Sequence, residues 1–280
     1  MLHTASFSAD GCRLMTKTDD LFSTALRYLG VYRLYTRVLE SEIKGGPMPK
    51  HIGVILDGNR RWAQERDYPE WMGHVFGADK VESLLEWCLE YKIHSLTLFA
   101  LSTENLSRDP EELKSIFQII ENKLQKLIDG HYVHKHRVHV KGLGNPDILT
   151  PGVRSRLEIL EKESENYSDL YLNFAIAYGG RMEIVQAVRK IASEVSKGTL
   201  DPLSIDEKKF SEYLFTSFLP EPDPDLIIRT SGEVRLSGFL LWQSAYSELV
   251  FMDVYWPGFR KLDFLRAIRT YQSRQRRFGR

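Results

Sequence analysis

The sequence has few cysteines, no long apolar run and no net charge. Its two cysteines, Cys12 and Cys88, indicate no disulfide framework and fit a reducing cytoplasm. No segment approaches the ~18–20 apolar residues that a membrane span needs, and the N-terminus lacks the charged-then-apolar order of a signal peptide. Because 38 Lys and Arg residues balance 38 Asp and Glu residues, no overall field favours nucleic acid. We therefore expect a cytoplasmic protein that binds no nucleic acid.

Several common catalytic motifs are also absent. The chain has no GxxxxGK(S/T) loop, no GxGxxG, no HExxH and no GxSxG. These absences argue against nucleotide binding by the familiar loops and against a zinc protease. A basic tail is present, because eight Lys or Arg residues and one acid follow from Arg260 to the end. Taken alone, such a tail is more often a solvated face than a site.

Short apolar runs alternate with helical patterns along the chain. We expect strands, separated by helices, over 52–56, 95–101, 137–143, 170–177, 226–229 and 249–254. This alternation predicts an α/β fold, a single domain with a mostly parallel central sheet covered by helices on both faces. We expect that domain over 47–280. An N-terminal extension over 1–46 precedes it, with a disordered start and then a helix over 21–43 that docks on the domain or lies at a membrane surface.

The stretch HIGVILDGNRRW, which begins at His51, organises the rest of the chain. Ile52–Leu56 predicts a buried strand, which delivers Asp57, Gly58 and two arginines into a helix start. Arginine forks match phosphate oxygens, and glycine permits close approach of the backbone. Asp57 would be the natural ligand for a magnesium ion shared with that phosphate. The alternative is that Asp-Gly is only a turn, and from this stretch alone both interpretations stay open.

Further polar clusters follow other predicted strands, where the carboxyl ends of a parallel sheet place ligands. One is the segment 229–237, RTSGEVRLS, whose arginines and hydroxyls would cup a second anion or form a charged loop. Another is FALSTEN, from Phe99 to Asn105, which alone more often caps a helix than does chemistry. Glu248 precedes an apolar strand and alone is a surface acid.

Taken together, these segments resemble one known family. The chain carries, in the order of the cis-prenyltransferases, the motifs HIGVILDGNRRWA, GHVFGADKV, FALSTEN, AYGGR, RTSGEVRLSGFLLWQSAYSEL and RRFG. That family comprises the undecaprenyl and dehydrodolichyl diphosphate synthases, and the match covers about Pro47 to Gly279. PMPKHI and SGEVRLS look closer to eukaryotic and archaeal members than to bacterial ones.

The resemblance implies a Mg²⁺-dependent transferase that joins isopentenyl diphosphate to an allylic prenyl diphosphate and forms cis double bonds, giving a polyprenyl diphosphate. It implies catalytic roles for Asp57 and Asn105, with Asp57 and Glu248 at the metal. Residues implied to bind the allylic diphosphate are Gly58, Asn59, Arg60, Arg61, Trp62, His74, Ser102, Thr103, Glu104 and Arg108. Those implied to bind isopentenyl diphosphate are Arg229, Arg235, Leu236, Ser237, Arg277 and Gly279. The RxG ending matches one that reaches the partner subunit's diphosphate, which implies a homodimer.

The residue types agree with this chemistry. Two diphosphates repel each other, so arginines and magnesium must neutralise them before the substrates approach. An amide such as Asn105 is a poor base, and we expect the departing diphosphate to take the proton while Asn105 positions it. The growing hydrocarbon needs an apolar tunnel, for which the helical stripe Leu113–Leu127 is the best wall. Plain core packing of that stripe stays open as the alternative.

Three positions depart from the family pattern. Members usually carry Arg where this chain has Glu70, and an acid there would repel the allylic diphosphate unless Arg66 compensates. Bacterial members have His at the position of Val234, and often an aromatic at that of Leu106. Glu70 keeps open an atypical condensation with another acceptor, or with a short or non-head-to-tail product, and the three changes together argue against transferring the product length of bacterial members.

A third hypothesis is a non-catalytic prenyltransferase subunit. Such a subunit would be expected to lose the first carboxylate or the arginine pair, and Asp57, Arg60 and Arg61 are all present. Peripheral membrane contact, through the product or the N-terminal helix, also stays open. The sequence fixes neither product length nor the preferred primer.

Overall fold

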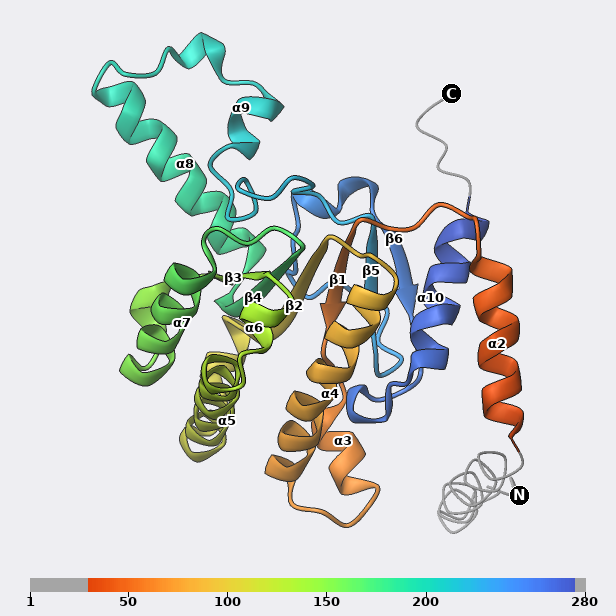
Figure 1. The fold of residues 1–280 in the computed structure, drawn as a ribbon. Coiled ribbons are helices and arrows are strands. Elements are labelled where there is room, and N and C mark those ends of the chain that lie inside the picture. The colour runs from red at the N-terminus through yellow and green to blue at the C-terminus, as the bar shows by residue number, and fades with distance from the viewer. Residues whose placement is uncertain (1–29, 275–280) are drawn as a thin grey trace, which may run out of the picture.

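A six-stranded parallel sheet forms the centre of the molecule, and the computed structural model describes residues 30–274 (Figure 1). Its strand order is β3-β4-β2-β1-β5-β6, and every neighbouring pair is parallel. The strands are β1 (His51–Ile55), β2 (Ser95–Ser102), β3 (Val138–Leu143), β4 (Leu170–Tyr178), β5 (Leu226–Arg229) and β6 (Glu248–Phe251). All six strands lie where the sequence predicts them. The predicted α/β fold with a parallel sheet is confirmed.

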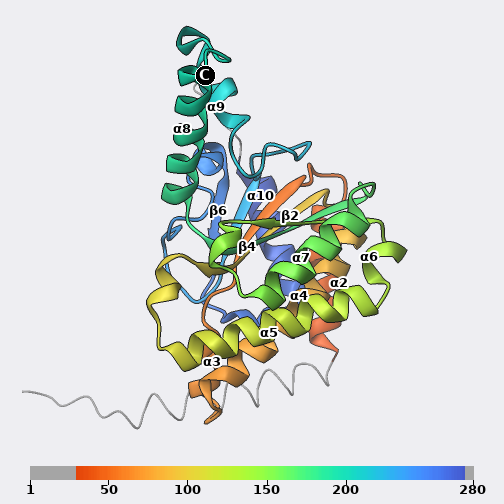
Figure 2. The same cartoon turned by 90° about the vertical axis from the view of Figure 1, so that its left-hand side faces the viewer.

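Helices separate the strands along the chain. They are α2 (Val31–Ile43), α3 (Asn59–Gln64), α4 (Glu70–Glu90), α5 (Pro110–Asp129), α6 (Tyr132–Lys135), α7 (Pro151–Ser164), α8 (Gly180–Ser196), α9 (Glu207–Ser211) and α10 (Lys261–Ser273). Helices α4, α5, α7 and α10 lie together on one face of the sheet, and α2 packs against α10 (Figures 1 and 2). The large core of buried Leu, Ile, Val and aromatic side chains fills this interface.

The opposite face is covered more thinly than the sequence predicts. Phe239 and Leu240, from a segment with little regular structure, are fully buried against Ile55 and Phe99 of the sheet. Helix α8 begins beside this cluster and then extends away from the sheet, together with α9 (Figure 2). Helices therefore lie on both sides, but a non-helical segment supplies much of the cover on this side. Phe239 stacks on Phe99 with ring centroids 4.9 Å apart, so an aromatic contact covers this part of the sheet.

Strand register determines which side chains meet at the carboxyl edge of the sheet. Ile55 lies level with Phe99 on one side and with Arg229 on the other. The residues just beyond these positions, including Asp57 and Ser102, therefore emerge at the same edge. The predicted polar clusters follow β1, β2 and β5, so the fold brings them together as the rule for parallel sheets requires.

The described part of the N-terminal extension docks on the domain. Leu39 and Ile43 of α2 are buried in the core, and the guanidinium groups of Arg260 and Arg266 lie over Tyr32 and Tyr35. The predicted disordered start and the first part of the predicted 21–43 helix lie outside the described residues. Between residues 30 and 274, no helix is long and apolar enough to cross a bilayer.

Candidate active site

Asp57 lies just past the end of β1 and is fixed there by its neighbours. The Thr230 hydroxyl accepts from the Asp57 backbone N–H at 3.1 Å and donates to the Asp57 carbonyl at 2.7 Å. Gly58 follows with φ +96°, and a Cβ at that position would lie 2.6 Å from the Tyr255 ring. Because L-residues rarely adopt this φ, glycine is required for the turn that presents the carboxylate.

The carboxylate of Asp57 pairs with Arg229 of the neighbouring strand. Its Oδ2 accepts from Arg229 Nη2 at 2.7 Å, and its Oδ1 accepts from the Gly58 N–H at 2.7 Å. Burial is the largest single effect and favours the neutral acid, but the hydrogen bonds from Arg229, Ser231 and the Gly58 N–H, together with the charge of Arg229, outweigh it and hold the pKa of Asp57 below its ordinary value. Arg229 is only 4% exposed and also donates to the Ser237 hydroxyl at 2.8 Å and to the Arg235 carbonyl. Asp57 is therefore an anion at neutral pH, next to a buried cation.

The two arginine clusters of the sequence face one another across a single cleft. Glu233 lies between them, because its Oε1 is 3.4 Å from Arg61 and its Oε2 bonds Arg235. Glu112 likewise lies between two arginines, 3.7 Å from Arg60 and 2.8 Å from Arg108. Each of these guanidinium groups is thus held near a carboxylate that an incoming anion can replace as its partner.

The cleft has a volume of about 720 Å³ and collects most of the residues predicted for the site. Those that line it are Asp57, Gly58, Asn59, Arg60, Arg61, His74, Ser102, Thr103, Glu104, Asn105, Arg108, Arg229, Arg235 and Ser237. Trp62, Leu236 and Glu248 do not line it. Arg277 and Gly279 lie outside the described residues, so their predicted role stays a prediction.

Trp62 and Leu236 have structural surroundings instead. The Trp62 ring packs on Phe76 with centroids 5.0 Å apart, and Arg66 lies over it at 4.6 Å. Arg66 therefore packs on this aromatic cluster and does not line the cleft, where it was expected to compensate for Glu70. Leu236 packs against the small apolar core on the thinly covered face of the sheet. Both side chains are partly buried in these contacts, and their predicted contact with substrate stays a prediction.

Glu248 does not meet Asp57 within this chain. It is the first residue of β6 and lies level with Leu226, which in turn lies level with Ile52. Asp57 comes five residues after Ile52, so a rise of ~3.3 Å per residue separates the two carboxylates by ~16 Å along the strands. Glu248 instead accepts from Arg274 at 3.0 Å. The expected pairing of Asp57 and Glu248 on one metal is therefore not formed within this chain. Glu248 begins β6 and lies at the amino edge of the sheet, whereas Asp57 follows the end of β1 at the carboxyl edge.

Asn105 is held by the turn that follows β2. Its Oδ1 accepts from the Ser102 N–H at 3.2 Å, and its own N–H donates to the Ser102 hydroxyl at 3.2 Å. This is the capping arrangement that the sequence left open as an alternative. It also fixes the amide in the cleft, so capping and positioning of substrate are compatible in the same residue.

His74 lies between the cleft and its apolar extension. Its ring is largely buried, and this burial, together with the nearby Arg108, lowers the pKa of His74 to about 4. The Glu112 carboxylate is 3.6 Å from Nε2, and that nitrogen has no hydrogen-bond partner within the described residues. His74 is therefore neutral at physiological pH, and its buried Nε2 faces the Glu112 carboxylate.

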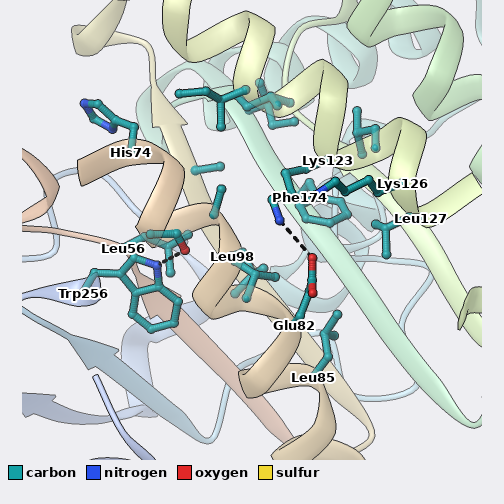
Figure 3. Close-up of a pocket in the computed structure, with 18 of the residues that line it drawn as sticks. Leu56, His74, Glu82, Leu85, Leu98, Lys123, Lys126, Leu127, Phe174 and Trp256 are labelled. Atoms are coloured by element: carbon teal, nitrogen blue, oxygen red, sulfur yellow. Dashed lines mark hydrogen bonds and ion pairs between the residues drawn. The ribbon is translucent and has the colours of Figure 1, made fainter. Parts of the chain in front are cut away.

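An apolar cavity of about 410 Å³ continues from the polar cleft (Figure 3). The two spaces share the lining residues Leu56, Asn59, His74, Ala100 and Ile116. The α5 stripe divides between the two interpretations made from sequence. Ile116, Ile120, Leu124 and Leu127 line the cavity, whereas Leu113 and Phe117 do not and pack in the core. The stripe is thus a tunnel wall on one side and core on the other.

Sequence reasoning missed several residues that shape the site. Glu112 and Thr230 were assigned no role, and Tyr255 was not noticed. Gly179–Met182 also line the cleft, although the AYGGR motif had been recognised without a site role. A signal existed for Glu112, because it lies four residues after Arg108, although Arg108 itself precedes the helix that begins at Pro110. Nothing in the sequence indicated that Thr230 would bond both backbone groups of Asp57.

The chain has close relatives among known proteins. The sequence model of a family described as putative undecaprenyl diphosphate synthase matches residues 55–279. A tritrans,polycis-undecaprenyl-diphosphate synthase (geranylgeranyl-diphosphate specific) from Methanopyrus kandleri is 52% identical over 250 residues, which cover 89% of this chain and 92% of that protein. The protein of the same name from Thermococcus kodakarensis is 49% identical over 250 residues, 89% of this chain and 94% of that protein.

Solved structures agree with the sequence matches. Lavandulyl diphosphate synthase from Lavandula x intermedia, in complex with dimethylallyl diphosphate, superposes with a TM-score of 0.81 at 33% identity over 83% of this chain and 99% of that chain. A probable undecaprenyl diphosphate synthase from Campylobacter jejuni gives a TM-score of 0.68 at 30% identity over 84% and 100% of the two chains. On sequence and on structure, this chain belongs to the undecaprenyl diphosphate synthase family, the cis-prenyltransferases.

Proposed function

We propose that this protein condenses isopentenyl diphosphate with an allylic prenyl diphosphate and forms cis double bonds, giving a polyprenyl diphosphate. One observation carries the proposal: the polar cleft with two facing arginine clusters opens directly into an apolar cavity. A substrate with a diphosphate head and a hydrocarbon tail matches that division. The names of the archaeal relatives support a product of the undecaprenyl type made from geranylgeranyl diphosphate.

The allylic diphosphate occupies the side of the cleft next to the cavity. Asn59 and His74 line both spaces, and Arg60 and Arg61 follow Asn59 in α3. With its head on these groups, together with Gly58, Ser102, Thr103, Glu104 and Arg108, the tail enters the cavity past Leu56. When the diphosphate binds, its oxygens replace the carboxylates of Glu112 and Glu233 as partners of the arginine guanidinium groups.

Isopentenyl diphosphate occupies the side formed by Arg229, Arg235 and Ser237. Arg229 is buried and oriented by Asp57 and Ser237, so it binds as a fixed donor at little entropic cost. Arg235 reaches the solvent-exposed side of the cleft and adds a second charge. We also assign Arg277 and Gly279 to this diphosphate. A protein that ends at Ser273 tests their role.

Asp57 fits the requirements of a Mg²⁺ ion that is shared with a diphosphate. Within residues 30–274 there is no group of three or more His, Cys, Asp or Glu side chains that would hold a metal alone. Mg²⁺ commonly takes one or two carboxylates together with substrate phosphates and water. Asp57 is ionised and faces the cleft, so it would hold the ion with the diphosphate oxygens. When bound, the ion would neutralise charge that develops on the leaving diphosphate.

The reaction breaks the bond between the allylic carbon and its diphosphate oxygen and forms a carbon–carbon bond to the terminal alkene carbon of isopentenyl diphosphate. A proton is then lost from the adjacent methylene, which forms the new double bond. The arginines stabilise charge on the departing diphosphate. That diphosphate takes the proton, and the Asn105 amide, held by Ser102, positions the isopentenyl group for its removal.

We also propose that two copies associate through α8. Val185 and Val188 on this helix are each about half exposed, and α8 extends away from the sheet (Figure 2). Apolar side chains gathered on such a helix face are typical of a subunit interface. We further propose that residues 47–280 form the catalytic domain and residues 1–46 an extension. A cytoplasmic location, with peripheral contact to a membrane through the product or the N-terminal helix, fits a long hydrocarbon product.

The direct test is incubation of the purified chain with Mg²⁺, labelled isopentenyl diphosphate and allylic diphosphates of increasing length. A ladder of labelled polyprenyl diphosphates, with cis double bonds by NMR, is the expected result. No labelled product with any primer would refute the proposal. A short, branched product would support an irregular condensation, which the likeness to lavandulyl diphosphate synthase and the position of Glu70, 3.9 Å from Arg60, keep as the second candidate.

A further inference from the structure

A buried carboxyl group lies behind the wall of the cleft that Ser237 helps to form. Glu183, in the first turn of α8, is 1% exposed and does not line the cleft. Its Oε2 accepts from the Tyr178 hydroxyl at 2.5 Å, and its Oε1 accepts from the Phe215 N–H at 2.7 Å and from Gln243 Nε2 at 3.1 Å. One side chain therefore joins the end of β4, the start of α8, the segment after α9 and the segment before β6.

The donors around Glu183 are buried together with it. Burial raises the pKa of Glu183, and the hydrogen bonds from Tyr178, Phe215 and Gln243 oppose that rise. Burial also raises the pKa of Tyr178, so its hydroxyl stays protonated and able to donate. Tyr178 is fully buried and Gln243 is 2% exposed. Removal of the carboxyl group would leave these buried donors without an acceptor, which is unfavourable.

The loop 237–243, which ends at one of these donors, has an unfavourable backbone conformation. Ser237 and Leu240 have φ of +49° and +43°, although neither is a glycine. Residues with a side chain adopt this left-handed region only where their surroundings hold them there. Arg229 donates to the Ser237 hydroxyl at 2.8 Å at one end of the loop, and the buried carboxyl group accepts from Gln243 at the other. The loop is therefore held at both of its ends.

The start of α8 also packs directly against this loop. The Gly180 N–H donates to the Gly238 carbonyl at 2.8 Å, and a Cβ at position 180 would lie 2.7 Å from the same oxygen. Gly180 and Leu241 line the cleft next to Ser237. Because Glu183 lies in the first turn of α8, its bond to the end of the loop fixes the loop against that turn.

We propose that Glu183 is a positioning residue for isopentenyl diphosphate, which holds Ser237 in the cleft through its bond to Gln243. The inference rests on the proposed condensation, in which Ser237 and Arg229 bind that diphosphate. Glu183 itself contacts no substrate. It keeps the loop in one conformation before the substrate arrives, so binding does not have to order the loop.

Glu183→Met tests this role, because Met fills a similar space without a carboxyl group. Steady-state kinetics give KM for each substrate, and isothermal titration gives Kd for isopentenyl diphosphate with an unreactive allylic thio-analogue bound. We expect KM and Kd for isopentenyl diphosphate to rise at least fivefold, while KM for the allylic diphosphate stays within twofold of wild type. Glu183→Gln should stay within twofold for both substrates, because its oxygen accepts from Phe215 and Gln243 and its amide donates to the Tyr178 hydroxyl.

Gln243→Met removes the same contact from the loop and leaves the bond between Tyr178 and Glu183 in place. It should raise Kd for isopentenyl diphosphate by the same factor. The double variant, Glu183→Met with Gln243→Met, should raise it no further, because both substitutions remove one shared contact. Glu194→Met is the matched control. Glu194 lies eleven residues further along α8 and accepts from Tyr213 at 2.6 Å, so it joins the helix to the segment after α9 away from the loop. This control should leave both KM values within twofold of wild type.

Urea unfolding and light scattering are recorded for every variant, so that loss of the fold or of association is measured directly. A Glu183→Met protein that is less stable but keeps the wild-type Kd for isopentenyl diphosphate would overturn the inference. An equal rise in KM for both substrates, or a rise in Glu194→Met as well, would also overturn it. Where Glu183→Met does not fold, Gln243→Met decides in the same way. A wild-type protein that binds no isopentenyl diphosphate, or that binds it and forms no product, would instead refute the proposed function.

Discussion

Arg229 donates to Asp57 at 2.7 Å across the neighbouring strands β5 and β1. This pair joins the carboxylate assigned to the metal to the arginine assigned to isopentenyl diphosphate. The parallel register makes the contact, because Ile55 lies level with Arg229 and Asp57 follows two residues later. Before substrate binds, each group neutralises the other, so the buried arginine is never left without an anion.

Substitution of Asp57 should remove turnover while the protein stays folded. Asp57→Asn keeps an oxygen to accept from Arg229 but loses the charge that holds the ion, and we expect kcat to fall by at least ~10³-fold, the scale of losing a preorganised electrostatic group. Asp57→Ala should be equally inactive and less stable by about 1–3 kcal/mol, since it also deprives Arg229 of a partner. Steady-state kinetics and urea unfolding measure both effects. Activity of Asp57→Asn within tenfold of wild type would contradict the metal role.

Glu70 should weaken binding of the allylic diphosphate, because it lies beside Arg60. It lies 3.9 Å from that arginine and accepts from Gln64 at 2.7 Å. Glu70→Arg should lower KM for the allylic diphosphate by about 2- to 5-fold, because exposed charges contribute only ~0.2–1 kcal/mol. Glu70→Gln, which removes charge without adding any, should give a smaller decrease. Equal KM values in all three proteins would show that Glu70 does not act on this substrate.

An acid on α8 should prevent association of two copies. Val188→Glu places a charge in the proposed interface, where its desolvation is costly, so the dissociation constant should rise at least ~100-fold. Light scattering during size-exclusion chromatography measures the mass. Ile159→Glu provides the control, because Ile159 is similarly exposed on α7, which packs on the opposite face of the sheet from the start of α8. A wild-type protein that is already a monomer at micromolar concentration would count against the dimer.

Stability should fall in mild acid because of a buried histidine in β1. Its ring bonds Thr97 at 2.8 Å and the Glu221 carbonyl at 2.9 Å, and burial lowers the pKa of His51 to about 4. The unfolded chain takes up this proton near pH 6.5, so the contribution is complete above that pH and is lost as pH falls toward 4. It amounts to about 3 kcal/mol from a shift of ~2.5 pKa units.

Urea unfolding of wild type and His51→Gln between pH 7.5 and 4 measures this contribution. The wild-type free energy of unfolding should fall more steeply than that of the variant, by up to one proton's slope. His94→Gln, at an exposed position, should follow wild type. Parallel curves for wild type and His51→Gln would contradict the buried neutral histidine.

Local patterns predicted the strands and most of the site. Apolar runs such as Ile52–Leu56 are short and bounded by turn residues, so their extent is visible in the sequence. The rule that ligands gather at the carboxyl edge of a parallel sheet then predicted that Asp57 and Ser102 lie close together.

Tertiary contacts decided the rest. Glu248 was assigned to the metal from a motif, yet its position depends on where β6 begins and on its register with β5. Trp62 adjoins the site in sequence, but its ring packs on Phe76 of the next helix, α4. Glu112 and Thr230 are ordinary residues in sequence, and only the fold shows that they hold the arginines and the backbone of Asp57. Apart from the spacing between Arg108 and Glu112, no periodicity or spacing indicates these contacts.

The central claim is that one cleft holds two diphosphates at the same time. Isothermal titration tests it most directly: the chain is saturated with an unreactive thio-analogue of an allylic diphosphate and Mg²⁺, and isopentenyl diphosphate is then added. We predict one further equivalent of binding per chain, lost in Arg229→Ala, whereas Arg60→Ala should weaken the analogue instead. Displacement of the analogue by isopentenyl diphosphate, or binding that ignores both substitutions, would contradict the account.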